Sequence, residues 1–167
     1  MRRFSFLVFG AVVVLAAAGC GGSASAPGGG TTTTNPTATA NLTDAAATAY
    51  TDAFNTMIDA VNADIPAQNQ ASTDPTGAAT AINNEVSARQ AFDTSVSAIS
   101  FPSADTADAQ AVLSSDAALE DALGTLAANT NDIANYNSVF TTVTTADDTF
   151  TAANAALSRN LGLTTSS

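Results

Sequence analysis

The sequence has no histidine, no lysine and no tryptophan, and it contains a single cysteine, Cys20. Without histidine a Ser-His-Asp triad has no base, and without lysine no Schiff-base nucleophile is available. A lone cysteine excludes an internal disulfide, and the usual histidine and cysteine ligands of zinc are missing. We therefore predict a non-enzymatic protein with no catalytic residue, no cofactor and no metal site. An enzyme that uses carboxylates alone, such as a glycosidase, is the alternative.

Basic residues are scarce as well, because four arginines stand against 15 acidic residues and give a formal net charge of −11. A chain of this charge does not neutralise phosphates, so we predict that it binds no nucleic acid. Alanine and threonine together fill more than a third of the 167 positions. Alanine is the best helix former, and the composition therefore favours an all-helical fold.

The first twenty residues have the pattern of a secretory signal. Arg2 and Arg3 precede an apolar run of 15 residues, Phe4 to Ala18, that ends in small side chains. A helix of this length is about 22 Å long, shorter than the roughly 30 Å hydrocarbon core of a bilayer. We therefore expect a cleaved signal peptide. An uncleaved transmembrane anchor is the alternative.

The signal segment ends in Leu15-Ala16-Ala17-Ala18-Gly19-Cys20. This ending resembles the lipobox of bacterial lipoproteins, with small residues at the two positions before the cysteine and Ala17 where the family prefers leucine. The resemblance implies cleavage before Cys20 and a diacylglycerol thioether on its sulfur. It also implies a lipid-anchored location on the extracytoplasmic face of a bacterial cell membrane. An ordinary signal peptide with an incidental cysteine is the alternative.

The expected modification of Cys20 has two physical consequences. Two acyl chains hold a protein on a membrane stably, whereas one chain gives only marginal binding. Cleavage also removes Arg2 and Arg3, which changes the net charge from −11 to −13. Because anionic lipid headgroups repel that charge, we expect the folded part to stand off the bilayer.

The chain divides by composition into four parts. Residues 1–19 form the signal peptide, and residues 20–41 hold the lipidated cysteine and a linker rich in Gly, Ser, Thr and Pro, which is predicted to be flexible. Residues 42–163 form the folded domain, and residues 164–167 form a short tail. The threonine cluster at 31–34 is interpreted as plain spacer, with O-glycosylation as the alternative.

From Leu42 onward, apolar residues recur every three or four positions and predict four amphipathic helices. The first is expected to begin at Thr43-Asp44 and to stop before Pro66. The second opens with Asp74-Pro75, an N-cap residue followed by proline at the first helical position.

The third helix is expected to open near Ser103, and the fourth begins at Ile133 and ends with a glycine cap at Gly162. A break of the fourth helix near Thr144 is the alternative, because threonine is a poor helix former. Four helices with short connections predict an all-α antiparallel up-down bundle.

Three charged residues lie on the predicted apolar stripes, namely Arg89, Asp116 and Asp147. A buried charge is costly unless it is paired. If the stripes are buried, we expect Arg89 to pair with Asp116 or Asp147 across helices. The alternatives are exposure of each residue at the rim of the bundle and a ligand pocket built around Arg89.

The remaining acidic residues are interpreted as structural. Asp105 and Asp108 are expected to compensate a helix dipole, and an exposed Glu85, Arg89 and Asp93 would form a weak ladder at spacing i, i+4. The stretch Asn129–Asp132 is rich in oxygen but lacks the closing acid of an EF-hand. The acids expected on solvated faces are Glu120, Asp121 and Asp148.

We predict a lipid-tethered interaction or spacer module of the cell envelope, attached to the membrane through Cys20 and contacting another envelope protein. The alternative is a small-ligand-binding or sensor lipoprotein with a pocket between helices. That pocket would be lined by some of the residues Tyr50, Phe54, Phe92, Phe140 and Phe150. The sequence sets neither the partner nor the oligomeric state.

Overall fold

A computed structural model describes residues 15–16 and 36–165, and it describes side chains over residues 42–163. The predicted lipidation site, Cys20, lies outside the described residues. So do most of the predicted signal peptide, the linker up to residue 35 and the last two residues of the predicted tail.

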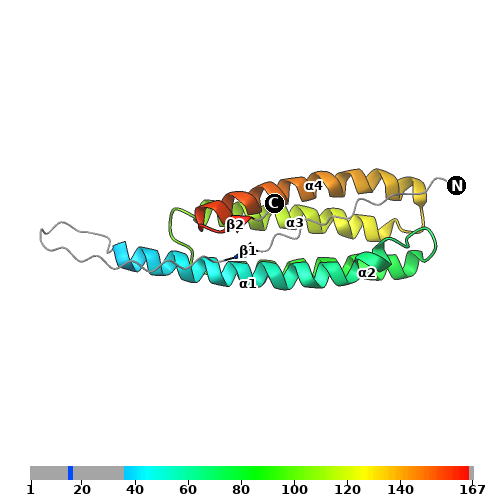
Figure 1. Cartoon of the computed structure of the whole chain (residues 1–167). Helices are drawn as coiled ribbons and strands as arrows, with labels where there is room; N and C mark the ends of the chain where they lie inside the picture. Colours follow the sequence, from blue (N-terminus) through cyan, green and yellow to red (C-terminus); the bar gives the residue numbers. More distant parts are fainter. Residues whose placement is uncertain (1–14, 17–35, 166–167) are drawn as a thin grey trace, which may run out of the picture.

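Helices make up nearly all of the described chain (Figure 1). They are α1 (Pro36–Gln68), α2 (Pro75–Ser97), α3 (Thr106–Ala128) and α4 (Ile133–Asn160), and they run up and down along one long axis. Two-residue strands, β1 (Leu15–Ala16) and β2 (Thr164–Thr165), pair antiparallel. The predicted all-α four-helix bundle is confirmed over the part of the chain that the structure describes.

The first helix is longer than predicted at both ends. It begins at Pro36, so the expected start at Thr43-Asp44 is wrong, and these residues lie inside the helix. It also continues past Pro66 to Gln68. Proline lacks an N–H and removes one intrahelical hydrogen bond. Pro66 lies in the last turn, so α1 ends two residues later, and the amide of Asn69 still donates to the carbonyl of Ile65 over 3.1 Å.

The predicted caps are confirmed at two helix ends. A carboxylate oxygen of Asp74 accepts a hydrogen bond from the amide of Gly77 over 2.9 Å, and Pro75 is the first residue of α2. At the end of α4, Gly162 has a φ of 72°. The Leu163 amide donates to the Ser158 carbonyl over 2.8 Å, which is the hydrogen bond of a Schellman motif.

The fourth helix is continuous through its threonine-rich stretch, so the alternative break near Thr144 is absent. The hydroxyls of Thr144, Thr145 and Thr149 each donate to the carbonyl four residues earlier in α4. These bonds satisfy the side-chain hydroxyls within the helix. The third helix begins at Thr106, three residues later than predicted.

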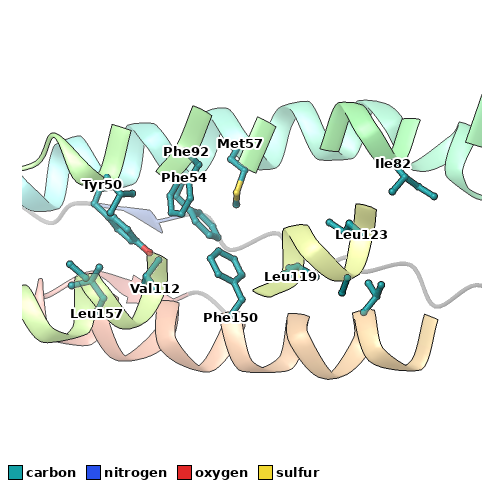
Figure 2. Close-up of a cluster of buried hydrophobic side chains, with 14 of the residues drawn as sticks. Tyr50, Phe54, Met57, Ile82, Phe92, Val112, Leu119, Leu123, Phe150 and Leu157 are labelled. Carbon is teal, nitrogen blue, oxygen red and sulfur yellow. The ribbon is translucent and has the colours of Figure 1, made fainter. Parts of the chain in front are cut away.

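The bundle core lies between two helical hairpins (Figure 1). Helix α1 packs on α2, α2 on α3, and α3 on α4. Figure 2 shows how aromatic residues of the first hairpin face side chains of the second. A hydrogen bond of 2.5 Å from the buried Tyr50 hydroxyl to the Asn154 side-chain oxygen joins α1 to α4.

Candidate functional site

The only arginine on a predicted apolar stripe is buried near the middle of the bundle. Arg89 lies on α2 and is 5% exposed. Its Nη1 donates to Asp116 Oδ1 on α3 over 2.7 Å, and its Nε donates to Glu85 Oε1 over 3.0 Å. The predicted pairing of Arg89 with Asp116 is therefore confirmed, and Asp147 is not among its ion-pair partners.

Local sequence explains this geometry. Glu85 and Arg89 are four residues apart on α2, so both side chains lie on one helix face. The weak ladder that an exposed Glu85 and Arg89 would form does not apply, because Glu85 is 7% exposed. The second carboxylate oxygen of Glu85, Oε2, accepts a hydrogen bond of 2.8 Å from Nε2 of Gln68, the last residue of α1. Arg89 also stands over the ring of Phe150, with Cζ 5.2 Å from the ring centroid.

A group of three carboxylates adjoins this ion pair. Asp93 lies one turn after Arg89 on α2, while Asp116 and Glu120 are four residues apart on α3. One oxygen from each lies within 4.8 Å of those from the other two. We call Asp93, Asp116 and Glu120 the carboxylate triad.

Each residue of the carboxylate triad has one buried oxygen that lacks a hydrogen-bond partner, namely Asp93 Oδ1, Asp116 Oδ2 and Glu120 Oε1. No other buried side-chain nitrogen or oxygen within residues 42–163 is left unsatisfied. Buried polar atoms in folded proteins are nearly always paired. The unsatisfied atoms of the described chain therefore gather at one place.

Burial and mutual repulsion change the acidity of these groups. Burial, followed by the charges of Asp116 and Glu120, raises the pKa of Asp93 to about 7. Burial also raises the pKa of Asp116, although the charge of Arg89 opposes the change. The pKa of Glu120 is raised by burial first and by Asp116 second. Asp147, half-buried on α4, has a pKa raised mainly by burial.

The other acidic residues divide between confirmed and corrected expectations. Asp121 and Asp148 are exposed as predicted, whereas Glu120 is partly buried, so its assignment to a solvated face is wrong. Asp105 is the N-cap residue of α3 but makes no side-chain capping bond. Asp108 lies in the first turn of α3, where it also accepts a hydrogen bond from Asn160 of α4 over 2.6 Å.

Sequence reasoning missed the carboxylate triad because its members come from two helices. The spacing of Asp116 and Glu120 already places them on one face of α3. The position of Asp93 beside them depends on how α2 is rotated against α3, which the sequence pattern does not fix. One feature of the sequence does point to this site. Asp116 lies on an apolar stripe, and a buried acid requires partners.

The aromatic residues expected to line a pocket mostly pack against one another instead. Phe92 has its ring centroid 5.9 Å from Tyr50, 6.1 Å from Phe54 and 6.1 Å from Phe150. Figure 2 shows these side chains pointing into the core. Phe140 stacks on Tyr136 on α4 with a centroid distance of 6.5 Å.

A groove of about 720 Å³ lies between α1 and α2. Small side chains line most of it, among them Ala49, Ala53 and Ala88, and Phe92 alone among the expected aromatic residues borders it. The groove and the carboxylate triad share no residue.

Comparison with known proteins found no matching protein-family model, no matching curated protein and no matching solved structure. Among the described residues, no helix has the length and apolar character needed to cross a membrane. The properties of the site therefore rest on its own geometry. Its carboxylates can share a proton or bind a cation, and its arginine holds two helices together.

Proposed function

We propose that this protein is a lipid-anchored extracytoplasmic module in which a diacylated Cys20 holds a helical domain at the bacterial cell envelope. The observation that carries the proposal is the leader, where arginines and an apolar run precede a lipobox-like ending at the sole cysteine. The domain acts as a non-enzymatic interaction or spacer module.

The shape of the helical domain supports a spacer role. Helix α1 has 33 residues and is therefore about 50 Å long. Its first turns extend beyond the ends of the other helices (Figure 1). Residues 36–41 of the predicted linker already belong to α1, so the rest of the linker, residues 20–35, leads directly in sequence into this rod. The mature net charge of −13 keeps that rod away from anionic headgroups.

The anchor is tested by Cys20→Ser in the full-length chain, expressed in a bacterium that processes lipoproteins. The unmodified sequence is expected to enter the detergent phase on phase partitioning and to incorporate a labelled fatty acid. The variant is expected to lose both properties, because serine offers no thiol for the thioether. Ser23→Ala is the matched control and should behave as the original chain. Detergent partitioning by Cys20→Ser equal to that of the original would refute the anchor.

Two exposed apolar side chains offer a way to separate the interaction role from the spacer role. Leu42 on α1 is 48% exposed and Ile133 at the start of α4 is 47% exposed. A photo-reactive residue at either position is expected to cross-link one specific envelope protein if the module binds a partner. The same probe at exposed Asp121 is the control. Equal, unspecific labelling from all three positions argues for a spacer.

The groove between α1 and α2 favours small-ligand binding as a second candidate function. Its volume lies in the range of known ligand pockets, roughly 300–1,000 Å³. Binding would raise the melting temperature, because a ligand that binds only the folded state stabilises it. A thermal-shift screen of metabolites against the original chain and against Ala53→Leu, which narrows the groove, tests this candidate. It fails if no compound stabilises the original chain more than the variant.

A further inference from the structure

We propose that Asp93, Asp116 and Glu120 form a binding site for one divalent cation. The proposal concerns the folded domain and holds whether or not Cys20 carries lipid. The three residues come from α2 and α3, and each brings a carboxylate oxygen to within 4.8 Å of those of the other two.

The first argument is the state of Asp116. Its side chain has no exposed area, so water does not reach it. Arg89 satisfies Oδ1, but no N–H or alcohol group donates to Oδ2, which within the chain only a proton shared with Asp93 would satisfy. A buried carboxylate oxygen without a partner is costly, and a cation beside it would remove that cost.

The second argument is that unsatisfied oxygens from three carboxylates lie at one place. Asp93 and Glu120 each add one more buried and unpartnered oxygen, and both residues belong to the same carboxylate triad. A single proton shared between Asp93 and Asp116 would leave the oxygen of Glu120 without a partner. One cation placed between the three carboxylates contacts all of them.

The third argument is charge. Arg89 is the only basic group that pairs with this part of the described bundle, and its two ion pairs already go to Glu85 and Asp116. Asp93 and Glu120 therefore have no positive partner of their own among the ion pairs of the described residues. Arg89 brings one positive charge to four carboxylates, those of Glu85 and of the carboxylate triad, so three negative charges remain when all are ionised. A divalent cation offsets two of them.

The donor set defines the class of ion. The triad offers only carboxylate oxygens, which suit hard cations such as Ca²⁺, Mg²⁺ and Mn²⁺ rather than metals that prefer sulfur or imidazole. Calcium binds oxygen at roughly 2.3–2.6 Å, so one ion spans oxygens separated by the observed distance. Asp93 and Glu120 are partly exposed, so the triad lies near the surface of the bundle, where an ion can enter from solvent.

The proposal is tested with the full chain after treatment with a chelator and its removal. Isothermal titration calorimetry with Ca²⁺, Mg²⁺ and Mn²⁺ measures affinity, and the paramagnetic resonance signal of free Mn²⁺ gives an independent count of bound ions. We expect one ion for each chain. Asp93→Asn and Glu120→Gln, which keep side-chain size, are each expected to weaken binding at least about tenfold, or roughly 1.4 kcal/mol.

Asp121→Asn is the matched control, because Asp121 follows Glu120 in sequence, is exposed and loses the same charge. It should change affinity less than about twofold. The proposal is overturned if the original chain binds none of the three ions at millimolar concentration. It is equally overturned if Asp121→Asn weakens binding as much as Asp93→Asn does. Circular dichroism of each variant shows whether the helices are intact. Asp116 is not substituted, because its loss would leave the buried Arg89 without its partner on α3.

Discussion

Two neighbouring parts of the same bundle interior are stabilised in different ways. The aromatic cluster around Phe92 is stabilised mainly by contacts between rings whose centroids lie about 6 Å apart. The charge cluster around Arg89 consists of groups that require partners of opposite charge. Phe150 belongs to both, because its ring packs edge-to-face with Phe92 and also lies beneath the Arg89 guanidinium. The stability of the aromatic cluster is expected to change little between pH 4 and pH 7, whereas that of the charge cluster depends on pH.

The largest expected effect comes from Phe92→Ala. Removing this ring leaves a cavity among Tyr50, Phe54 and Phe150, and truncation of a buried phenylalanine costs about 4 kcal/mol of unfolding free energy. Urea denaturation measures the loss, and it should be the same at acidic and neutral pH. A loss that shrinks strongly in acid would show that the aromatic cluster depends on the charges.

Arg89→Met is expected to cost about 3 kcal/mol at neutral pH, because it leaves Glu85 and Asp116 buried without their partner. Unlike the loss in Phe92→Ala, this one should shrink in acid, where the stranded carboxylates take up protons. Arg159→Met at the exposed end of α4 is the control and should stay within about 0.5 kcal/mol of the original. Equal urea midpoints for Arg89→Met and the original chain would show that the ion pairs of Arg89 do not stabilise the fold.

The pH dependence of stability follows from the raised pKa of Asp93. An acid whose pKa is higher in the folded than in the unfolded state binds more protons when folded, so stability falls as pH rises. For Asp93 the fall is expected between its ordinary value of 3.8 and about 7. The pKa values of Asp116, Glu120 and Asp147 are raised in the same direction.

The measurement is the urea midpoint of the chelator-treated chain across this pH range. Asp93→Asn should flatten part of the curve, because it removes one of the titrating groups. A midpoint that stays constant or rises from pH 4 to pH 7 contradicts the prediction.

The smallest expected effect comes from Tyr50→Phe. The change keeps the ring packing but removes the hydroxyl that donates to Asn154, which costs about 1 kcal/mol. Tyr136→Phe, at a second buried tyrosine on α4, is the comparison and should cost less. Thermal or urea denaturation of both variants measures which one loses more unfolding free energy. An equal loss would show that the hydrogen bond from Tyr50 to Asn154 does not stabilise the contact between α1 and α4.

Local sequence signals predicted most of the fold. Apolar spacing located the helices, and Asp74 and Gly162 marked two of their ends. The acids on the apolar stripes reduced the expected partners of Arg89 to Asp116 or Asp147, and the structure shows Asp116. These features depend on residues within a few turns of one another or on the rule that buried charges pair. The N-terminal extension of α1 was missed, because its first turns carry no apolar stripe.

The carboxylate triad was missed for a different reason. Its formation depends on the rotation of α2 against α3, which is set by the packing of many side chains from both helices at once. Glu120 is the clearest case. Its neighbours in sequence suggested a solvated face, whereas in the folded chain one of its oxygens is buried close to Asp93 of the preceding helix, α2.

The burial of Arg89 also affects how the protein is detected. Trypsin cuts after lysine and arginine, and this chain has no lysine. Within residues 42–163 the folded chain exposes Arg159 but hides Arg89, so digestion of the native domain begins near its C-terminal end. After denaturation, the peptide between the two arginines is still too long for routine mass spectrometry. Proteomic surveys built on trypsin and amine-reactive reagents will therefore undercount this protein, and a protease that cuts at aspartate is the better choice.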